Sequence, residues 1–518
     1  MTGSADRRPQ AGPNLSHTTF AGLRWSYVDA IGNALIQLVW VSLSSRLLPT
    51  EVFGLMAVAA LTVQFGMFFS RMGVAHALVQ RQEITDDDVR ASATSGLVTG
   101  LLCFGVLWVA APWVGAAVFS DPQPEVVGLL RVLGVSFVLT GLAMTSHALL
   151  RRQLRFRELA VVHVIANAAS LVVGVGLLLA GAGVWALVGN SLTTGAVNLV
   201  LLYRRSRHPL RPLWAVRPFK ALYSFGARVS MLRLMEFVGK NLDTFFVARF
   251  MGAALLGQYS RGYQLVLLPL NRFLSNSLSV VLFPSFSSIQ DDPDRLRRGF
   301  ISVLGLGAMV LLPTCAGLAV AAVEFVEVFL GDRWSVAAQL VPWFAVGAGM
   351  SILTHMTQVL CEARAELNRN MAIQAGSLVG LAGMLLVAAR FGIEAFAIAL
   401  LLSEVARHLA FLLLARGVVG LTGRDVLGAY VPALVGSLVV AGLVAGARWL
   451  LISSGVPLGV VFAGEVAAGT TALVLAVRFN PFSQIRSQLA MRLRAVGVLR
   501  ADRVWVARTA RLVVGRNA

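Results

Sequence analysis

Apolar stretches long enough to cross a lipid bilayer recur along almost the whole of this 518-residue chain. A helix needs about 20 apolar residues to cross a hydrocarbon core about 30 Å thick, and we count fourteen such stretches. Hydrophobic residues make up 57% of the chain and charged residues only 13%, with a mean hydropathy of +0.76. A soluble protein of this composition would have to expose much apolar surface to water. The sequence therefore predicts an all-α polytopic membrane protein with about 14 transmembrane helices.

Each predicted span is identified by its approximate centre. In chain order the centres are Gln37, Ala60, Leu102, Val138, Leu171, Ser191, Glu236, Leu267, Met309, Gly349, Gly380, Leu401, Val435 and Ala467. The polar segment 1–22 lacks the short apolar core of a cleaved signal peptide, so we expect the first span to act as its own anchor.

The basic residues are distributed unequally between the two sides of the membrane. With the N-terminus inside, the inner connections hold 31 of the 44 lysines and arginines, and the outer connections hold 5. By the positive-inside rule we expect both termini in the cytoplasm. The membrane itself is expected to be the plasma (inner) membrane. This distribution explains the net charge of +19 without nucleic acid as a partner.

Short motifs recur at a nearly constant offset. Segments 46–54 (RLLPTEVFG) and 249–257 (RFMGAALLG) share their Arg-to-Gly spacing and lie 203 positions apart. The segment AGVWAL around Gly183 has a counterpart in FGIEAF around Gly392. The shared offset indicates a duplicated six-span unit, and because six is even, both copies enter the bilayer in the same orientation.

The chain is therefore expected to form two six-helix lobes, related as a parallel internal repeat, plus two C-terminal helices. The predicted bounds are 1–22 for a cytoplasmic segment, 23–204 for the N-lobe, 205–221 for a cytoplasmic connector, 222–416 for the C-lobe, 417–478 for spans 13 and 14, and 479–518 for a basic cytoplasmic tail.

The seventh span carries a stripe of charges. At 100° per residue, Arg233, Glu236, Lys240 and Asp243 fall within about 80° of one another on a helix. Insertion scales assign roughly +2.5 to +3.5 kcal/mol to each Lys, Arg or Asp at mid-span, so four of them facing lipid would cost about 10 kcal/mol. We therefore expect the stripe to face protein or water.

The first span carries a milder polar stripe of Asp29, Asn33 and Gln37 at intervals of four. Further polar residues of the second and eighth spans complete a predicted hydrated chamber with net positive charge: Arg71, Tyr259, Arg261, Gln264, Asn271 and Arg272. The alternative is that these charges form internal ion pairs that hold helices in register.

No metal site or cofactor is expected. The histidines His76, His147, His163 and His355 share no helical face and no ligand spacing, and the three cysteines have no spacing suited to a metal.

The run from Ser44 to Gly100, which contains RLLPTEVFG and ALVQR, resembles the N-terminal region of Wzx-type polysaccharide flippases of the multidrug/oligosaccharidyl-lipid/polysaccharide superfamily. The likeness covers roughly residues 20 to 480. It implies a transporter, not an enzyme, that moves undecaprenyl-pyrophosphate-linked oligosaccharide from the inner to the outer leaflet for lipopolysaccharide or exopolysaccharide assembly. Membrane lipids, and a polysaccharide polymerase or glycosyltransferases, are then its candidate partners.

A substrate of this kind suggests a division of roles within the chamber. The residues expected to attract the pyrophosphate are Arg71, Arg233, Lys240, Arg261 and Arg272. Those expected to contact sugar are Asn33, Gln37, Tyr259 and Asn271. Glu236 and Asp243 either bind a coupling proton or sodium ion or neutralise the basic groups.

Three rival functions remain open. A lipid II flippase of the MurJ type also has fourteen spans and a cationic chamber. A drug/cation antiporter shares the two-by-six plan but would be expected to have an acidic chamber. A membrane glycosyltransferase or polymerase would need catalytic carboxylates on a large outer loop, whereas the outer connections here are short.

Overall fold

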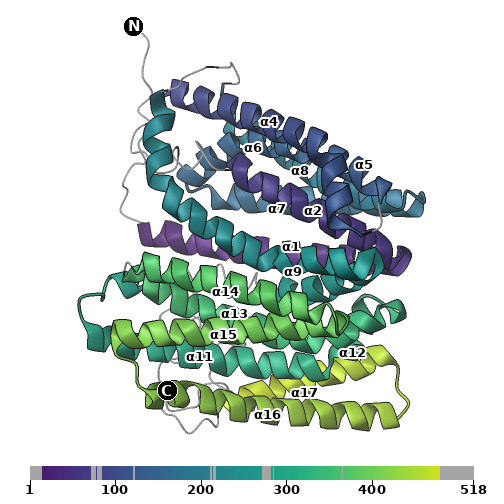
Figure 1. The fold of residues 1–518 in the computed structure, drawn as a ribbon, viewed down its shortest axis with the longest axis vertical. Coiled ribbons are helices and arrows are strands. Elements are labelled where there is room, and N and C mark those ends of the chain that lie inside the picture. Colours follow the sequence, from purple (N-terminus) through teal and green to yellow (C-terminus); the bar gives the residue numbers. More distant parts are fainter. Residues whose placement is uncertain are drawn as a thin grey trace. The chain divides into compact units, whose positions relative to one another are not determined.

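A computed structural model describes residues 15–71, 78, 84–120, 123–209, 213, 217–270, 282–283, 285–364 and 366–478. These residues are almost entirely helical, as Figure 1 shows, and no strand occurs among them. Within these described ranges, eleven helical stretches are long and apolar enough to cross a membrane. Each of the fourteen predicted span centres falls within a helix, which confirms the all-α membrane fold.

The chain divides into two compact units at Ser260. The helices of the first unit are α1 (Leu15–Leu47), α2 (Thr50–Arg71), α4 (Asp86–Val118), α5 (Pro124–Leu133), α6 (Val135–Arg152), α7 (Phe156–Leu179), α8 (Val184–Ser206) and most of α9 (Arg217–Leu270). Within α9, Gly252 has non-helical dihedral angles, and it lies between the predicted seventh and eighth spans.

The second unit begins at Arg261. Its further helices are α11 (Pro293–Val320), α12 (Ala322–Phe329), η2 (Asp332–Trp334), α13 (Ser335–Ala363), α14 (Leu367–Ala388), α15 (Ile393–Val419), α16 (Gly423–Ser453) and α17 (Leu458–Arg478). The domain bounds expected from the sequence stay a prediction.

The helices of the second half repeat the order of the first. The pair α7 and α8 corresponds to α14 and α15, and the broken pair α5 and α6 corresponds to the continuous α13. Gly183 and Gly392 each precede the second helix of their pair and have φ values of 57° and 91°. Only glycine adopts such angles without strain, so the repeated motif marks the same turn twice.

The other repeated motif forms a reciprocal contact within the first unit. A Cβ atom on Gly54 would lie 1.9 Å from the carbonyl oxygen of Ala253, and one on Gly257 would lie 1.8 Å from that of Thr50. An offset of 203 converts Thr50 into Ala253 and Gly54 into Gly257. The two copies thus cross through the same small residues, as expected for helices that approach closely in lipid.

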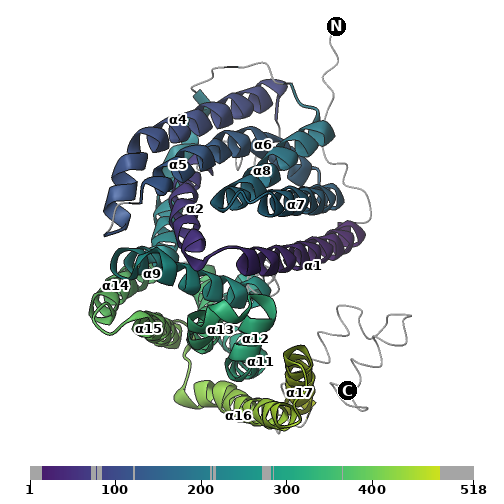
Figure 2. The same ribbon diagram turned by 90° about the vertical axis from the view of Figure 1, so that its right-hand side faces the viewer.

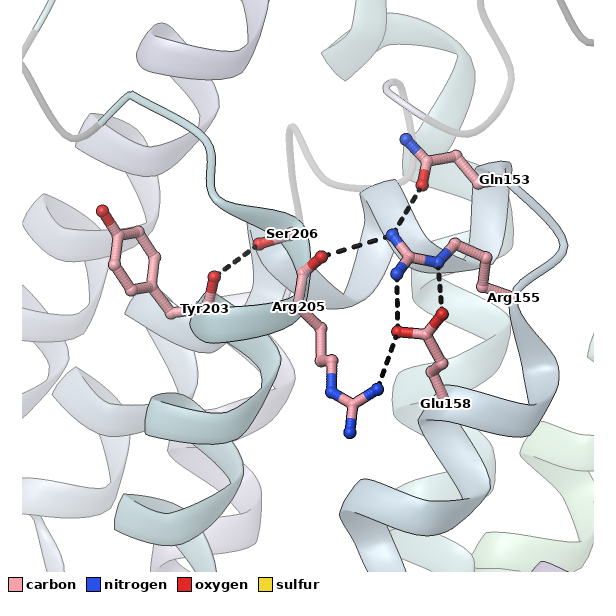
Figure 3. Close-up of polar contacts among 6 residues, drawn as sticks. All are labelled: Gln153, Arg155, Glu158, Tyr203, Arg205 and Ser206. Carbon is pink, nitrogen blue, oxygen red and sulfur yellow. Dashed lines mark hydrogen bonds and ion pairs between the residues drawn. The ribbon is translucent and has the colours of Figure 1, made fainter.

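Contacts in the first unit join connections that were predicted on the same side of the membrane. On the outer side, the Ser120 hydroxyl donates to the carbonyl of Arg249 at 2.7 Å. On the inner side, Arg155 donates to the carbonyl of Arg205 at 3.2 Å and forms a two-pronged ion pair with Glu158 (Figure 3). The arginine therefore ties the turn between α6 and α7 to the end of α8.

The second unit shows the same pattern at its predicted inner side. Arg297, in the first turns of α11, pairs with Asp425 in the first turn of α16 at 2.5 Å. Arg364, after α13, donates to the carbonyl of Gln290 at 2.6 Å. These contacts agree with an alternating path of spans through each unit.

We predict that Gly257→Ala lowers the thermal stability of the detergent-solubilised protein. The added methyl group overlaps the carbonyl of Thr50, and overpacking of this kind costs about 1–3 kcal/mol. Gly105→Ala in α4 is the matched control, because nothing lies within 4 Å of its new Cβ. Equal melting temperatures for the two variants would contradict the close crossing of α2 and α9.

Candidate functional site: a polar network in the first unit

Polar side chains occupy one face of α7. His163, Asn167 and Ser170 are spaced by four and three residues, so they share one side of the helix. In Figure 2, α7 lies beside α1, which carries Asp29 and Asn33 on the predicted polar stripe. The contact between the two helices is therefore polar within otherwise apolar spans.

The hydrogen bonds across this contact form a directed chain. The Asn33 amide donates to Asp29 Oδ1 at 2.5 Å, which leaves its own oxygen to accept from the Asn167 amide at 2.8 Å. Asn167 also donates to the carbonyl of His163 at 3.0 Å. His163 Nδ1 lies 3.4 Å from Asp29 Oδ2, and because a carboxylate only accepts, the imidazole is the donor.

Two further helices extend this cluster. Asn190 of α8 donates to the carbonyl of Ser170 at 2.8 Å. The ring of His147 on α6 stacks on that of His163, with centroids 6.0 Å apart and planes 18° apart. We call the following residues the polar network: Asp29, Asn33, His147, His163, Asn167, Ser170 and Asn190.

A glycine allows these helices to pack closely. A Cβ atom on Gly174 of α7 would lie 2.6 Å from the ring of Trp40 and 3.1 Å from the amide nitrogen of Asn190. The absence of a side chain at this position lets Trp40 and Asn190 approach α7, one helical turn beyond Ser170.

The polar network is buried at one part and accessible at another. Asn33 is only 6% exposed, whereas the side chains of Asp29 and His163 are 29% and 30% exposed. The buried amide of Asn33 fixes the orientation of Asp29, and the exposed groups can hydrogen-bond to a ligand. A carboxylate accepts from hydroxyl groups, and an imidazole can donate or accept, so the network suits a ligand rich in hydroxyls.

The charged residues of α9 differ in their exposure. Glu236 is half-buried, Lys240 is exposed and Asp243 is 1% exposed. The Tyr259 hydroxyl donates to Asp243 Oδ2 at 2.7 Å and is itself buried. Lys240 thus places an exposed positive charge on the same helix as the buried carboxylate of Asp243.

The remaining predicted site residues are placed as follows. Arg261, buried in the second unit, donates to Gln264 at 2.9 Å, and Gln37 is half-buried on α1. The side chains of four residues lie outside the described part of the structure: Arg71, Arg233, Asn271 and Arg272. The structure therefore brings Asp29 to Asn33, Asp243 to Tyr259, and Arg261 to Gln264. Their roles in substrate binding stay predictions.

Sequence reasoning missed the contribution of α7 and α8 to this site. The spacing of His163, Asn167 and Ser170 could have revealed a polar face, but the histidines were compared only with one another. His147 and His163 share no helical face, yet they stack because α6 and α7 bring them together. Among the described residues, no group of three or more His, Cys, Asp or Glu side chains could hold a metal ion.

Polar and ionisable side chains between membrane-spanning helices are costly in lipid and are typical of proteins with a substrate or ion path. A family model described as "Polysaccharide biosynthesis protein" matches residues 43–339, more than half of the chain. The chain therefore belongs to this family.

Similarity to individual proteins extends beyond the family match. The chain is 25% identical over 361 residues to the teichuronic acid biosynthesis protein TuaB of Bacillus subtilis (strain 168), which covers 68% of this chain and 74% of TuaB. It is 24% identical over 331 residues to the lipopolysaccharide biosynthesis protein WzxC of Escherichia coli (strain K12), covering 62% and 65%. These matches confirm the resemblance to Wzx-type proteins.

The fold is similar to that of a solved structure of the lipid II flippase MurJ in an inward closed conformation. The TM-score is 0.66 and the sequences are 11% identical, with 88% of this chain and 97% of that chain covered. The family match and the apolar helices make this protein a multi-pass membrane protein of polysaccharide biosynthesis. The relatives and the fold agree with the expectation of a transporter and not an enzyme.

We predict that Asn167→Leu destabilises the protein by about 1–3 kcal/mol, because the buried Asn33 oxygen loses its donor. The double variant Asn33→Leu/Asn167→Leu should lose less stability than the sum of the two single variants, because both partners of the hydrogen bond are removed together and no unpaired amide remains. Thermal unfolding measures both effects, with Ser191→Ala on the exposed face of α8 as the control. Strictly additive losses would contradict a direct contact.

Proposed function

We propose that this transporter moves an undecaprenyl-pyrophosphate-linked oligosaccharide from the inner to the outer leaflet of the plasma membrane, by alternating access, for surface polysaccharide assembly. The observation that carries the proposal is the polar network, which places partly exposed hydrogen-bonding groups among membrane spans of a polysaccharide biosynthesis protein. Such groups are costly in lipid and are kept where they serve a substrate or ion path.

The sugar part of the substrate is assigned to the polar network. A sugar presents many hydroxyl groups, each of which donates and accepts. Asp29 can accept two of these donors and His163 can exchange one, while Asn33 and Asn167 hold Asp29 in place. Gln37, one helical turn beyond Asn33, extends the same surface of α1.

The pyrophosphate is assigned to basic residues, since phosphates bind strongly to charged donors. Lys240 is the described member of this set that is exposed, and the others retain this role as proposals: Arg71, Arg233, Arg261 and Arg272. The polyprenyl tail needs no polar contact and can stay in lipid.

The orientation of the chain follows from its arginines. Both termini are proposed to lie in the cytoplasm, because 31 basic residues fall on that side and 5 on the other. Within the first unit, the contact of Arg155 with the end of α8 supports the grouping of those two connections on one side. Within the second unit, the pairing of Arg297 with the start of α16 supports the same grouping for its own connections.

The family match favours this substrate class over lipid II. The likeness to the MurJ structure concerns the fold, which lipid II and polysaccharide flippases share, whereas the sequence relatives are named for polysaccharide biosynthesis. The exposed Lys240 can bind the pyrophosphate of a polyprenyl-linked substrate, whereas its positive charge would repel a cationic drug.

We predict that Asp29→Asn reduces export of surface polysaccharide about tenfold or more at an unchanged level of protein in the membrane. The amide oxygen introduced by this change can still accept from Asn33, so the helix contact persists, but the charge-assisted bonds to sugar, worth about 1.5–3 kcal/mol, are weakened. Cells without the native copy and complemented with each variant provide the assay. Full export by Asp29→Asn would remove the sugar-binding role.

We predict that the double variant Arg233→Gln/Lys240→Gln abolishes export while the protein remains in the membrane, because both positive charges on the stripe of α9 are lost. Arg390→Gln, in the turn between α14 and α15, is the control that removes a charge elsewhere. Normal export in the double variant would exclude these residues from pyrophosphate binding.

A further inference from the structure

Two buried carboxyl groups meet one arginine where α17 packs against α12 and α16. Glu324 of α12 is 2% exposed and the side chain of Glu465 on α17 is 0% exposed. Figures 1 and 2 show α16 and α17 side by side, and Arg448 lies near the end of α16. Glu324 lies 124 positions before Arg448 in the sequence, whereas Arg448 and Glu465 belong to consecutive helices.

The arginine is engaged mainly by one of the two acids. Arg448 Nε donates to Glu324 Oε1 at 2.7 Å, whereas it lies 4.0 Å from Glu465 Oε1. Because both oxygens lie so near one nitrogen, the two carboxyl groups are neighbours. Neither oxygen of Glu465 has a hydrogen-bond partner among the described residues, nor does Glu324 Oε2.

The surroundings of this triad are apolar. Phe462, just before Glu465 on α17, packs against Phe325 and Phe329 of α12, with ring centroids 5.9 and 5.8 Å apart. On the other side, Val444 of α16 belongs to a buried cluster that includes Ala472 of α17. A charge that is not balanced here would be strongly destabilising.

The charges of the triad do not balance when both acids are ionised. Two carboxylates and one guanidinium leave one net negative charge. Within the described helices around α17, the other basic groups of α11, α16 and α17 stand in the first or last turns, so none of them is placed to balance this charge. Besides the triad, the described residues of α11, α12, η2, α16 and α17 include the following charged groups: those of segment 294–298, Glu327, Asp332, Arg333, Arg424, Asp425 and Arg478.

We propose that Glu324 and Glu465 form a proton-binding site, in which Glu465 carries the proton and donates it toward the free oxygen of Glu324. One proton makes the triad neutral and provides a hydrogen bond from one oxygen of Glu465 to Oε2 of Glu324. A metal cation fits poorly, because hard cations need about six oxygen ligands and the described residues offer no metal-binding group. The site is independent of the proposed substrate.

This site would couple proton binding to the packing of the last spans. Release of the proton leaves a net negative charge between α12 and α17, and the two carboxylates then repel each other. Acidic conditions therefore favour the packed arrangement of α12, α16 and α17.

Infrared spectroscopy of the full-length protein in lipid vesicles tests the proposal directly. The spectrum of the wild type at neutral pH should contain a carbonyl band of a protonated carboxylic acid that is lost in Glu465→Gln. Gln is isosteric with the protonated acid, so the variant should remain folded. Glu327→Gln is the matched control on α12 and should keep the band.

A second variant keeps the test decisive. Arg448→Gln removes the balancing cation, so the other carboxyl group should also take up a proton and one further band should appear. Identical acid bands in the wild type and Glu465→Gln, or no gain in Arg448→Gln, would overturn the proposal. Loss of the wild-type band on addition of sodium ions at constant pH would also overturn it, because a cation would then occupy the site.

Discussion

Polar groups within the hydrocarbon region must find their partners inside the protein, because lipid offers none. The helices satisfy their own backbone, so the side chains impose the remaining constraint on how the helices meet. In the first unit this constraint brings α1 and α7 together, since the Asn33 amide needs Asn167 on one side and Asp29 on the other. The same bonds that hold the helices in register also orient the partly exposed carboxylate of Asp29. The hydrogen bonds that determine the packing are therefore the same ones that position Asp29 for its proposed role in binding sugar.

Close backbone contact complements these polar contacts. Without a hydrophobic driving force between helices, small residues allow the approach that makes dispersion forces effective. Gly96 of α4 and Gly141 of α6 illustrate this, because a Cβ on either would lie within 2.3 Å of the other's carbonyl oxygen. The reciprocal contact of Gly54 and Gly257 has the further feature that the two sites are copies of one motif. The two sides of this contact are therefore formed by two copies of the same motif.

Much of the fold could be predicted because it depends on local signals. Hydropathy placed the spans, and the repeated motifs around Gly183 and Gly392 fall at equivalent turns of the two halves. The polar stripe of α1 was visible from the spacing of Asp29 and Asn33. Its partner on α7 was not, because spacing identifies a face and not the helix that covers it. The proximity of Glu324 and Glu465 escaped prediction for the same reason.

Transport of an intact lipid-linked glycan is the central claim, and it can be measured with purified components. Vesicles containing the protein and a polyprenyl-pyrophosphate-linked oligosaccharide would be treated with an external glycosidase or lectin that cannot cross the membrane. The account predicts that the inner pool of glycan becomes accessible without any change in its mass. Access no greater than in protein-free vesicles, or a change in the mass of the glycan, would contradict it.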